Sequence, residues 1–188
     1  MPSKNMRAKD RLIWIDCEMT GILPDKDVLI EIATIVTDSE LNILDRGPDL
    51  AIRQSPKCLR EMNAWCRRTH RASGLIDRIA TEGVALEEAE RQTLNFIRKY
   101  CYAKSAPLCG NSVGHDKAFL YRGMPQLYSF LHYRIIDVSS VKLLAFNWFG
   151  AKCQPPEKQS THRALQDIEE SITELKYYRK LFTGKKAK

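Results

Sequence analysis

The sequence predicts an α/β protein with a mixed sheet flanked by helices. Residues 12–21 begin as an apolar strand, and residues 28–37 form a β-branched run that is typical of a central strand. Further along, helical and strand patterns alternate, as they do where helices cover a sheet. With 188 residues, 44% of them hydrophobic, the chain is long enough for one domain with a substantial core.

The first three strands are expected to be antiparallel. A third strand falls within residues 41–54, around residues 51–53, and the polar residues 38–40 predict a hairpin that joins it to the second strand. The helices that follow are expected at residues 57–69, 73–75 and 85–100. The last of these has the clearest apolar stripe, which indicates that it packs against the sheet.

The second half of the chain is expected to add parallel strands and three helices. The strands are predicted at residues 107–110 and 133–138. The helices are predicted at residues 117–122, 141–148 and 163–182, with a proline-containing loop over residues 150–160. We expect a single domain over residues 11–183, with basic tails at residues 1–10 and 184–188.

The charge balance is basic, with 30 Lys and Arg against 23 Asp and Glu and a net charge of +7. Such an excess suits a polyanion such as nucleic acid, although many basic proteins bind none. The 6 cysteines include no C-x-x-C pair, which argues against a zinc site. No apolar run reaches the roughly 18 residues of a membrane span, so we expect no membrane partner and an intracellular protein, cytoplasmic or, alternatively, in the mitochondrial matrix.

Two acids interrupt the end of the first strand. Asp16 and Glu18 are two residues apart, so a strand directs them to the same face, whereas Cys17 points to the other. Two neighbouring carboxylates repel each other and are costly to bury unless a positive charge lies between them. A divalent cation is the simplest candidate; the alternative is that the strand ends here and both acids are solvated.

Three further residues carry the same chemistry. Asp116 follows a strand-to-helix junction, where the helix dipole alone favours a carboxylate by about 0.3–1 kcal/mol. His162 and Asp167 would be separated by roughly 140° on one helix, so they approach one site only if His162 lies in the preceding loop. An exposed loop histidine is the alternative. Together with the D-x-E pair, these residues suit two hard cations and a base.

Five segments of the chain resemble the oligoribonucleases. They are WIDCEMTG at 14–21, LNIL at 41–44, GNS at 110–112, HYRIIDVS at 132–139 and THRA at 161–164. Oligoribonucleases are 3′-to-5′ exonucleases of the DEDDh group with a ribonuclease H-like fold, and the likeness extends over about residues 12–182 in matching order.

The resemblance implies a 3′-to-5′ exoribonuclease that degrades short oligoribonucleotides, especially dinucleotides, to nucleoside 5′-monophosphates. It assigns two Mg²⁺ or Mn²⁺ ions, about 3.5–4 Å apart, to Asp16, Glu18, Asp116 and Asp167. It makes His162 the general base, a role that suits a side chain with an ordinary pKa of about 6.5.

The resemblance also implies which residues select the substrate. Ser112, Arg134 and Ser139 match a pocket for the 5′-phosphate, although Arg134 pairing with Asp137 or a surface acid is an alternative. Tyr133 matches a tyrosine that acts from the partner subunit of a homodimer. The positions that flank or separate the bases are matched by Trp65, His70 and Ile22. For Trp65 the alternative is a place in the core.

Four residues depart from the family pattern, and none removes a catalytic group: Cys17, His115, Gly123 and Gln166. His115 beside Asp116 is either a solvated histidine or a competing metal ligand. The sequence disfavours two other functions. A DNA-trimming exonuclease is disfavoured by the matches at Trp65, Arg134 and Tyr133, and a non-catalytic RNA-binding module is disfavoured by the complete set of catalytic residues.

Overall fold

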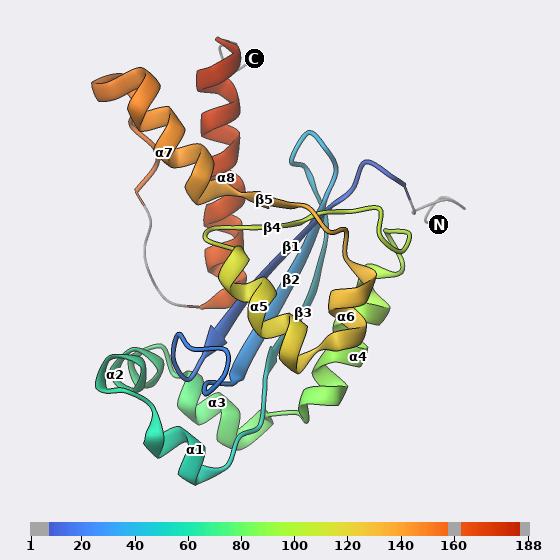
Figure 1. Ribbon diagram of the computed structural model, residues 1–188, viewed down its shortest axis with the longest axis vertical. Coiled ribbons are helices and arrows are strands. Elements are labelled where there is room, and N and C mark those ends of the chain that lie inside the picture. Colours follow the sequence, from blue (N-terminus) through green and yellow to red (C-terminus); the bar gives the residue numbers. More distant parts are fainter. Residues whose placement is uncertain (1–7, 158–162, 185–188) are drawn as a thin grey trace.

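The computed structural model describes residues 8–157 and 163–184, in which a five-stranded sheet has the order β3-β2-β1-β4-β5 (Figure 1). The strands are β1 (Leu12–Met19), β2 (Leu29–Thr37), β3 (Ile43–Ala51), β4 (Leu108–Gly110) and β5 (Ile135–Asp137). The first three pair antiparallel, and β4 and β5 extend the sheet in parallel from β1. This mixed sheet confirms the predicted fold class.

Helices cover both faces of the sheet. The covering helices are α4 (Leu86–Ile97), α5 (Gly114–Gly123), α6 (Pro125–Phe130), α7 (Val138–Phe149) and α8 (Ala164–Thr183). The helices α1 (Pro56–Glu61), α2 (Ala64–Ala72) and α3 (Leu75–Glu82) pack in a separate cluster with Ile30 and Ala51. One buried cluster joins the sheet to α4, α5 and α6, and a second joins its other face to α7 and α8. The long helix α8 therefore lies on the opposite face from α5 (Figure 1).

The side chains of β1 alternate between these two faces. Ile13, Ile15 and Cys17 are buried in the cluster that contains α4 and α5. Trp14 is buried on the α8 face, where its indole N–H donates a hydrogen bond of 3.1 Å to Thr37 Oγ1. The alternation continues to the end of the strand, so Asp16 and Glu18 share one face, as predicted, and that face is the one covered by α8.

The single helix predicted over residues 57–69 is wrong, because the segment forms two helices. Met62 has an extended backbone (φ −52°, ψ 144°) that ends α1. Asn63 then starts α2 by accepting the N–H of Cys66 on its side-chain oxygen, at 2.9 Å. Asparagine is among the preferred N-cap residues, and its capping bond outweighs the continuous apolar spacing.

Two other elements differ from expectation. The short helix α6 was not predicted; it begins with Pro125, a residue whose fixed φ suits a first helical position. The strand expected at residues 133–138 is limited to Ile135–Asp137, so Tyr133 and Arg134 lie before it. The predicted tails fall largely on residues 1–7 and 185–188, outside the described part of the chain.

Among the described residues, no helix combines the length and the apolar character that crossing a bilayer requires.

Candidate active site

All four predicted metal-binding acids line one cavity, of about 630 Å³, at the carboxyl end of β1. The cavity is formed by β1 and the loop after it, by the segment that leads into α5, and by the start of α8: Asp16, Cys17, Glu18, Met19, Ile22, Asn111, Ser112, His115, Asp116, Asp167, Glu170 and Ser171. Segments about 150 residues apart in the sequence thus contribute to a single site.

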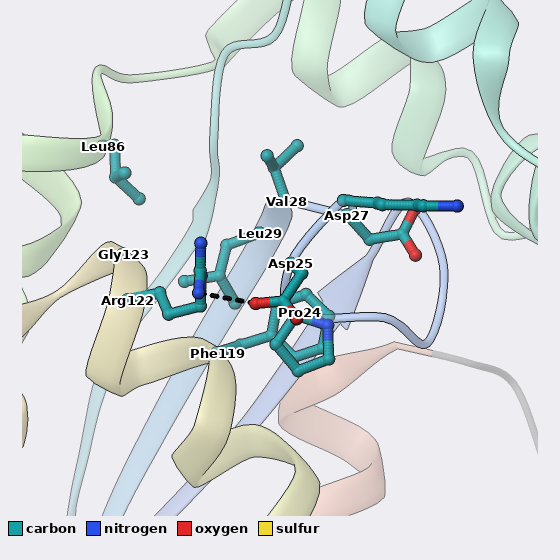
Figure 2. Close-up of a pocket in the computed structure, with 10 residues that line it drawn as sticks. Pro24, Asp25, Asp27, Val28, Leu29, Leu86, Phe119, Arg122 and Gly123 are labelled. Atoms are coloured by element: carbon teal, nitrogen blue, oxygen red, sulfur yellow. Dashed lines mark hydrogen bonds and ion pairs between the residues drawn. The ribbon is translucent and has the colours of Figure 1, made fainter.

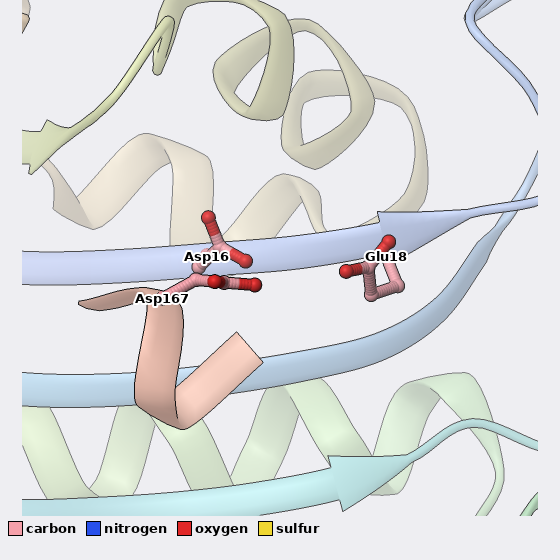
Figure 3. Close-up of side chains that lie close together, drawn as sticks. All are labelled: Asp16, Glu18 and Asp167. Atoms are coloured by element: carbon pink, nitrogen blue, oxygen red, sulfur yellow. The ribbon is translucent and has the colours of Figure 1, made fainter. Parts of the chain in front are cut away.

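Asp16, Glu18 and Asp167 form the tightest group in the cavity. One oxygen of each carboxylate lies within 4.8 Å of those of the other two. Figure 3 shows Asp16 and Glu18 on β1 and Asp167 on the first turn of α8. Three converging carboxylates offer only hard oxygen ligands, which suit Mg²⁺ or Mn²⁺ better than softer metals.

The pKa values of these acids reflect an uncompensated negative centre. Burial, and then the charge of Asp116, raises the pKa of Asp16 well above its ordinary value. Burial and the neighbouring Glu31 raise the pKa of Glu18 to about 8. Burial also raises the pKa of Asp116 to about 7. A divalent cation would supply the missing positive charge, so the residues present fit a metal.

Asp116 reaches the cavity from the other side of β1. It lies in the first turn of α5, as predicted, and it accepts the backbone N–H of Cys17. His162, the predicted general base, lies outside the described residues; in the sequence it precedes the start of α8 at Ala164 by two residues.

Ser112 and Ser139 meet at the edge of the cavity. Their hydroxyl oxygens are 3.1 Å apart, and the backbone N–H of Ser112 donates to Ser139 Oγ at 3.0 Å and to Asp137 Oδ1 at 2.9 Å. Asp137 also caps α7 by accepting the N–H of Ser139. Ser112 has a positive φ of 51°, which this pair of bonds holds in place.

Arg134 and Tyr133 do not line the cavity of their own chain. The guanidinium of Arg134 lies over the Tyr133 ring, 4.7 Å from its centre, and the His132 ring lies 4.5 Å from the same ring. Tyr133 is 70% exposed. Among the described residues Arg134 forms no ion pair with Asp137 or with another acid, whereas Oδ1 of Asp137 caps α7.

The residues predicted to contact bases divide into two exposed side chains and one buried one. Trp65 is 54% exposed, which excludes a place in the core, and Ile22 is 72% exposed at the rim of the cavity. His70 is buried; its Nε2 lies 2.9 Å from the carbonyl oxygen of Met19, and its Nδ1 lies 3.8 Å from Glu18 Oε2. The buried His70 thus contacts the last two residues of β1, Glu18 and Met19.

Sequence reasoning missed several cavity residues. Glu170 follows Asp167 by three positions, a spacing that places both on one side of α8. Asn111 links the two halves of the site, because its amide donates to Ser171 Oγ at 2.7 Å and its oxygen accepts from Ser139 Oγ at 3.1 Å. The i, i+3 spacing was a usable signal for Glu170, whereas the contacts of Asn111 depend on the tertiary fold.

Two of the departures from the family pattern have visible consequences. His115 lines the cavity, but its ring packs on Phe119 at 5.2 Å and it is outside the tight group of acids. Gly123 borders a separate cavity of about 290 Å³ (Figure 2). A Cβ at position 123 would meet Leu29 at 3.2 Å and Leu86 at 3.8 Å, so a larger side chain would enter this space.

This second cavity is bordered by residues 24–28, which belong to the same β1–β2 loop as Ile22. Figure 2 shows the ion pair at its edge, in which Arg122 Nη1 lies 2.6 Å from Asp25 Oδ1. The loop is also held from inside, since Asp27 accepts from Thr20 Oγ1 at 3.1 Å and from the Leu23 N–H at 2.9 Å. A side chain at position 123 would therefore contact this second cavity, whose lining includes none of the four predicted metal-binding acids.

Comparison with known proteins gives a consistent family. A sequence model described as exonuclease (RNase T) matches residues 13–175. The chain is 51% identical over 178 residues to an oligoribonuclease of Haemophilus ducreyi, covering 95% of this chain and 97% of that protein. It is 50% identical over 178 residues to an oligoribonuclease of Pasteurella multocida, with the same coverage.

Solved structures share the fold. The zinc-bound complex of E. coli Exonuclease I with single-stranded DNA superposes with a TM-score of 0.71 at 14% identity, over 95% of this chain and 42% of that one. The same enzyme in complex with a dT13 oligonucleotide gives a TM-score of 0.70 at 17% identity, over 93% and 43%. This chain thus spans less than half the length of these structural neighbours.

Proposed function

The chain belongs to the oligoribonucleases of the exonuclease family, and from this premise we propose that it degrades short single-stranded RNA from the 3′ end, with dinucleotides as its preferred substrates. Each cycle adds water across the last phosphodiester bond. The water oxygen forms a bond to phosphorus, the bond from phosphorus to the 3′-oxygen breaks, and a nucleoside 5′-monophosphate leaves.

The convergence of Asp16, Glu18 and Asp167 carries this proposal, with Asp116 on the wall of the same cavity. These four carboxylates would hold two Mg²⁺ or Mn²⁺ ions. When bound, such ions stabilise the charge on the attacking and leaving oxygens of an in-line displacement. The carboxylates would orient the ions and offset their positive charge, and they would not themselves take the proton of the water.

Proton removal is assigned to His162. In the sequence it stands two residues before the start of α8 and five residues before Asp167. A histidine with an ordinary pKa of about 6.5 is mostly neutral at physiological pH, so it can accept a proton without metal coordination.

Selection of short RNA is assigned to two sets of residues, one for the 5′-phosphate and one for the bases. Ser112 and Ser139 present paired hydroxyls that suit a 5′-phosphate, with Arg134 as the cationic partner. Trp65 is exposed and offers an aromatic surface on which a base of any sequence can stack. Ile22, exposed at the rim of the cavity, is assigned as an aliphatic wedge between bases. A phosphate-binding end limits the length of RNA that the site accepts.

We also propose a homodimer, with Tyr133 of one chain serving the site of the other. The support is its position: the side chain is 70% exposed, lies outside the cavity of its own chain, and is held between His132 and Arg134. The bacterial relatives support a cytoplasmic site of action.

The decisive experiment is hydrolysis of a 5′-labelled diribonucleotide by the purified chain. We expect cleavage with Mg²⁺ or Mn²⁺, loss of cleavage in EDTA, and no activity in Asp167→Ala. A preference for long RNA over dinucleotides would contradict the proposed phosphate-limited site.

A matched deoxydinucleotide tests a second candidate, a DNA exonuclease, which the Exonuclease I neighbours favour. Faster cleavage of the DNA substrate would select that function. Binding of RNA without cleavage in any metal would indicate a non-catalytic module.

A further inference from the structure

Glu31 is a buried carboxylate that the proposed reaction does not use. It is 0% exposed in the middle of β2 and lies directly across from Glu18 in the antiparallel pair of β1 and β2. Cross-strand partners share a face of the sheet, so Glu31 faces α8 beside the metal-binding acids. A carboxylate at such a place is costly unless both of its oxygens are bonded.

The two oxygens of Glu31 bind two different parts of the fold. The guanidinium of Arg78, on α3, donates to Oε1. The backbone N–H of Ala164, the first residue of α8, donates to Oε2 at 3.3 Å. Glu31 therefore joins α3, β2 and the start of α8.

Arg78 is itself fixed by two more acids. Its Nη2 lies 3.2 Å from Asp49 Oδ1 on β3, and its Nε lies 2.8 Å from Glu82 Oε1, four residues further along α3. Only 17% of the Arg78 side chain is exposed. The guanidinium is thus held in one orientation, and it fixes the carboxylate of Glu31 in turn.

The start of α8 depends on this outside carboxylate. Arg163, the N-cap residue, makes no side-chain capping bond to its own helix; its guanidinium instead donates to the Ser73 carbonyl at 3.2 Å. An acid at a helix N-terminus bonds an otherwise orphaned N–H and interacts favourably with the helix dipole. Glu31 supplies that acid from the sheet.

We propose that Glu31 and Arg78 are positioning residues that anchor the start of α8 and thereby hold Asp167 against Asp16 and Glu18. Asp167 follows Ala164 by three residues, within the same helical turn, so a shift of the anchored N–H moves the metal-binding carboxylate with it. Neither residue lines the cavity. The inference rests on the proposed function for the role of Asp167.

The test is the double variant Glu31→Met/Arg78→Met, measured without RNA by calorimetric titration with Mn²⁺. Replacing a buried ion pair by apolar residues of similar size is often neutral or stabilising, so the variant is expected to fold. Because one negative and one positive charge are removed together, the net charge near the metal site is unchanged. We expect Mn²⁺ affinity to fall about 10-fold or more, and kcat on a diribonucleotide to fall similarly with KM about unchanged.

Two single variants separate positioning from charge. Glu31→Asp keeps the charge but is one methylene shorter, so we expect a loss of Mn²⁺ affinity like that of the double variant. Wild-type affinity in Glu31→Asp would show that Glu31 acts only through its charge and does not position α8. Glu82→Gln alters the solvent-side partner of Arg78 and leaves Glu31 alone, so it should bind Mn²⁺ as the wild type does.

A folded double variant with wild-type Mn²⁺ affinity and kcat would overturn the inference. If the double variant does not fold, Glu31→Asp decides the question by the same titration. If the wild-type chain fails to hydrolyse RNA, the proposed function fails, whereas the Mn²⁺ titrations still report whether Glu31 and Arg78 position Asp167.

Discussion

Cys17 donates its backbone N–H to Oδ1 of Asp116 over 3.0 Å, which ties the first turn of α5 to β1 between Asp16 and Glu18. The two residues are 99 positions apart in the sequence. Asp116 comes from the helix layer that contains α5, whereas Asp16, Glu18 and Asp167 lie on the face covered by α8. The bond to Cys17 holds Asp116 at the same edge of the sheet as these three acids. The site therefore receives carboxylates from both layers of the fold.

The first prediction separates the structural and the chemical role of Asp116. Asp116→Asn keeps an oxygen that accepts the Cys17 N–H, but it removes the charge. Because burial makes that charge costly, with a pKa raised to about 7, the metal-free variant should unfold at the wild-type temperature or above. Its kcat should fall by about 100-fold. Thermal unfolding and steady-state hydrolysis measure both, and nearly full activity would remove Asp116 from the metal site.

The second prediction concerns stability without metal, which should fall as pH rises from about 5 to 8. Burial and neighbouring acids raise the pKa of Glu18 from 4.5 to about 8, and the pKa of Asp16 is raised for the same reason. Between pH 4.5 and about 8, Glu18 is protonated more in the folded state than in the unfolded chain. The free energy of unfolding therefore decreases as pH rises through this range. Urea unfolding in EDTA at several pH values measures the slope.

Magnesium should reverse this trend, because the metal binds the deprotonated acids. The stabilisation by a fixed excess of Mg²⁺ is therefore expected to grow with pH. Glu18→Gln is the control: it lacks the titrating group, so its stability in EDTA should depend less on pH. Identical slopes for the variant and the wild type would show that Glu18 keeps an ordinary pKa.

Much of the fold was predictable because its signals are local. The β-branched run of β2 and the alternation in β1 follow directly from the residues, and the apolar stripe of α8 does as well. The errors arose where a single residue decides the local structure. Asn63 divides one apolar helical pattern into α1 and α2, and Pro125 starts a short helix that has little periodicity.

The acids of the site were predictable one by one, but their geometry was not. Asp16 and Glu18 share a face through the strand period alone, whereas the approach of Asp167 depends on how α8 packs. Glu31 shows the limit most clearly. Its position in the sequence is that of a polar residue in an apolar strand, and only the cross-strand register and the start of α8 reveal its partners.

The third prediction addresses the 5′-phosphate. Ser139→Ala removes a hydroxyl and one of the two side-chain oxygens that accept the Ser112 N–H. We expect KM for a 5′-phosphorylated diribonucleotide to rise about 10-fold, as loss of a hydrogen bond to a charged group implies. A dinucleoside monophosphate without the 5′-phosphate should be much less affected. The exposed neighbour Ser140→Ala is the control, and equal effects on both substrates would exclude a phosphate role.

The dimer proposal concerns Tyr133, which does not line the cavity of its own chain. The Tyr133 ring lies between the His132 ring and the Arg134 guanidinium. Its centre is 4.5 Å from the centre of the His132 ring and 4.7 Å from Arg134 Cζ, and most of its surface is exposed. Such a fixed, projecting aromatic is suited to a neighbouring molecule. In a twofold dimer each chain would offer its tyrosine to the other.

The fourth prediction is that two inactive variants restore activity when their chains are exchanged. In a mixed dimer of Tyr133→Ala and Asp116→Ala, one site combines intact acids from the first chain with the tyrosine of the second. Random exchange of equal amounts should therefore recover about a quarter of the wild-type activity. If Tyr133 served its own chain, every site would lack either the tyrosine or the acid, and mixing would recover nothing. Sedimentation of the mixture verifies that dimers are present, so the absence of recovery could be assigned to the tyrosine rather than to dissociation.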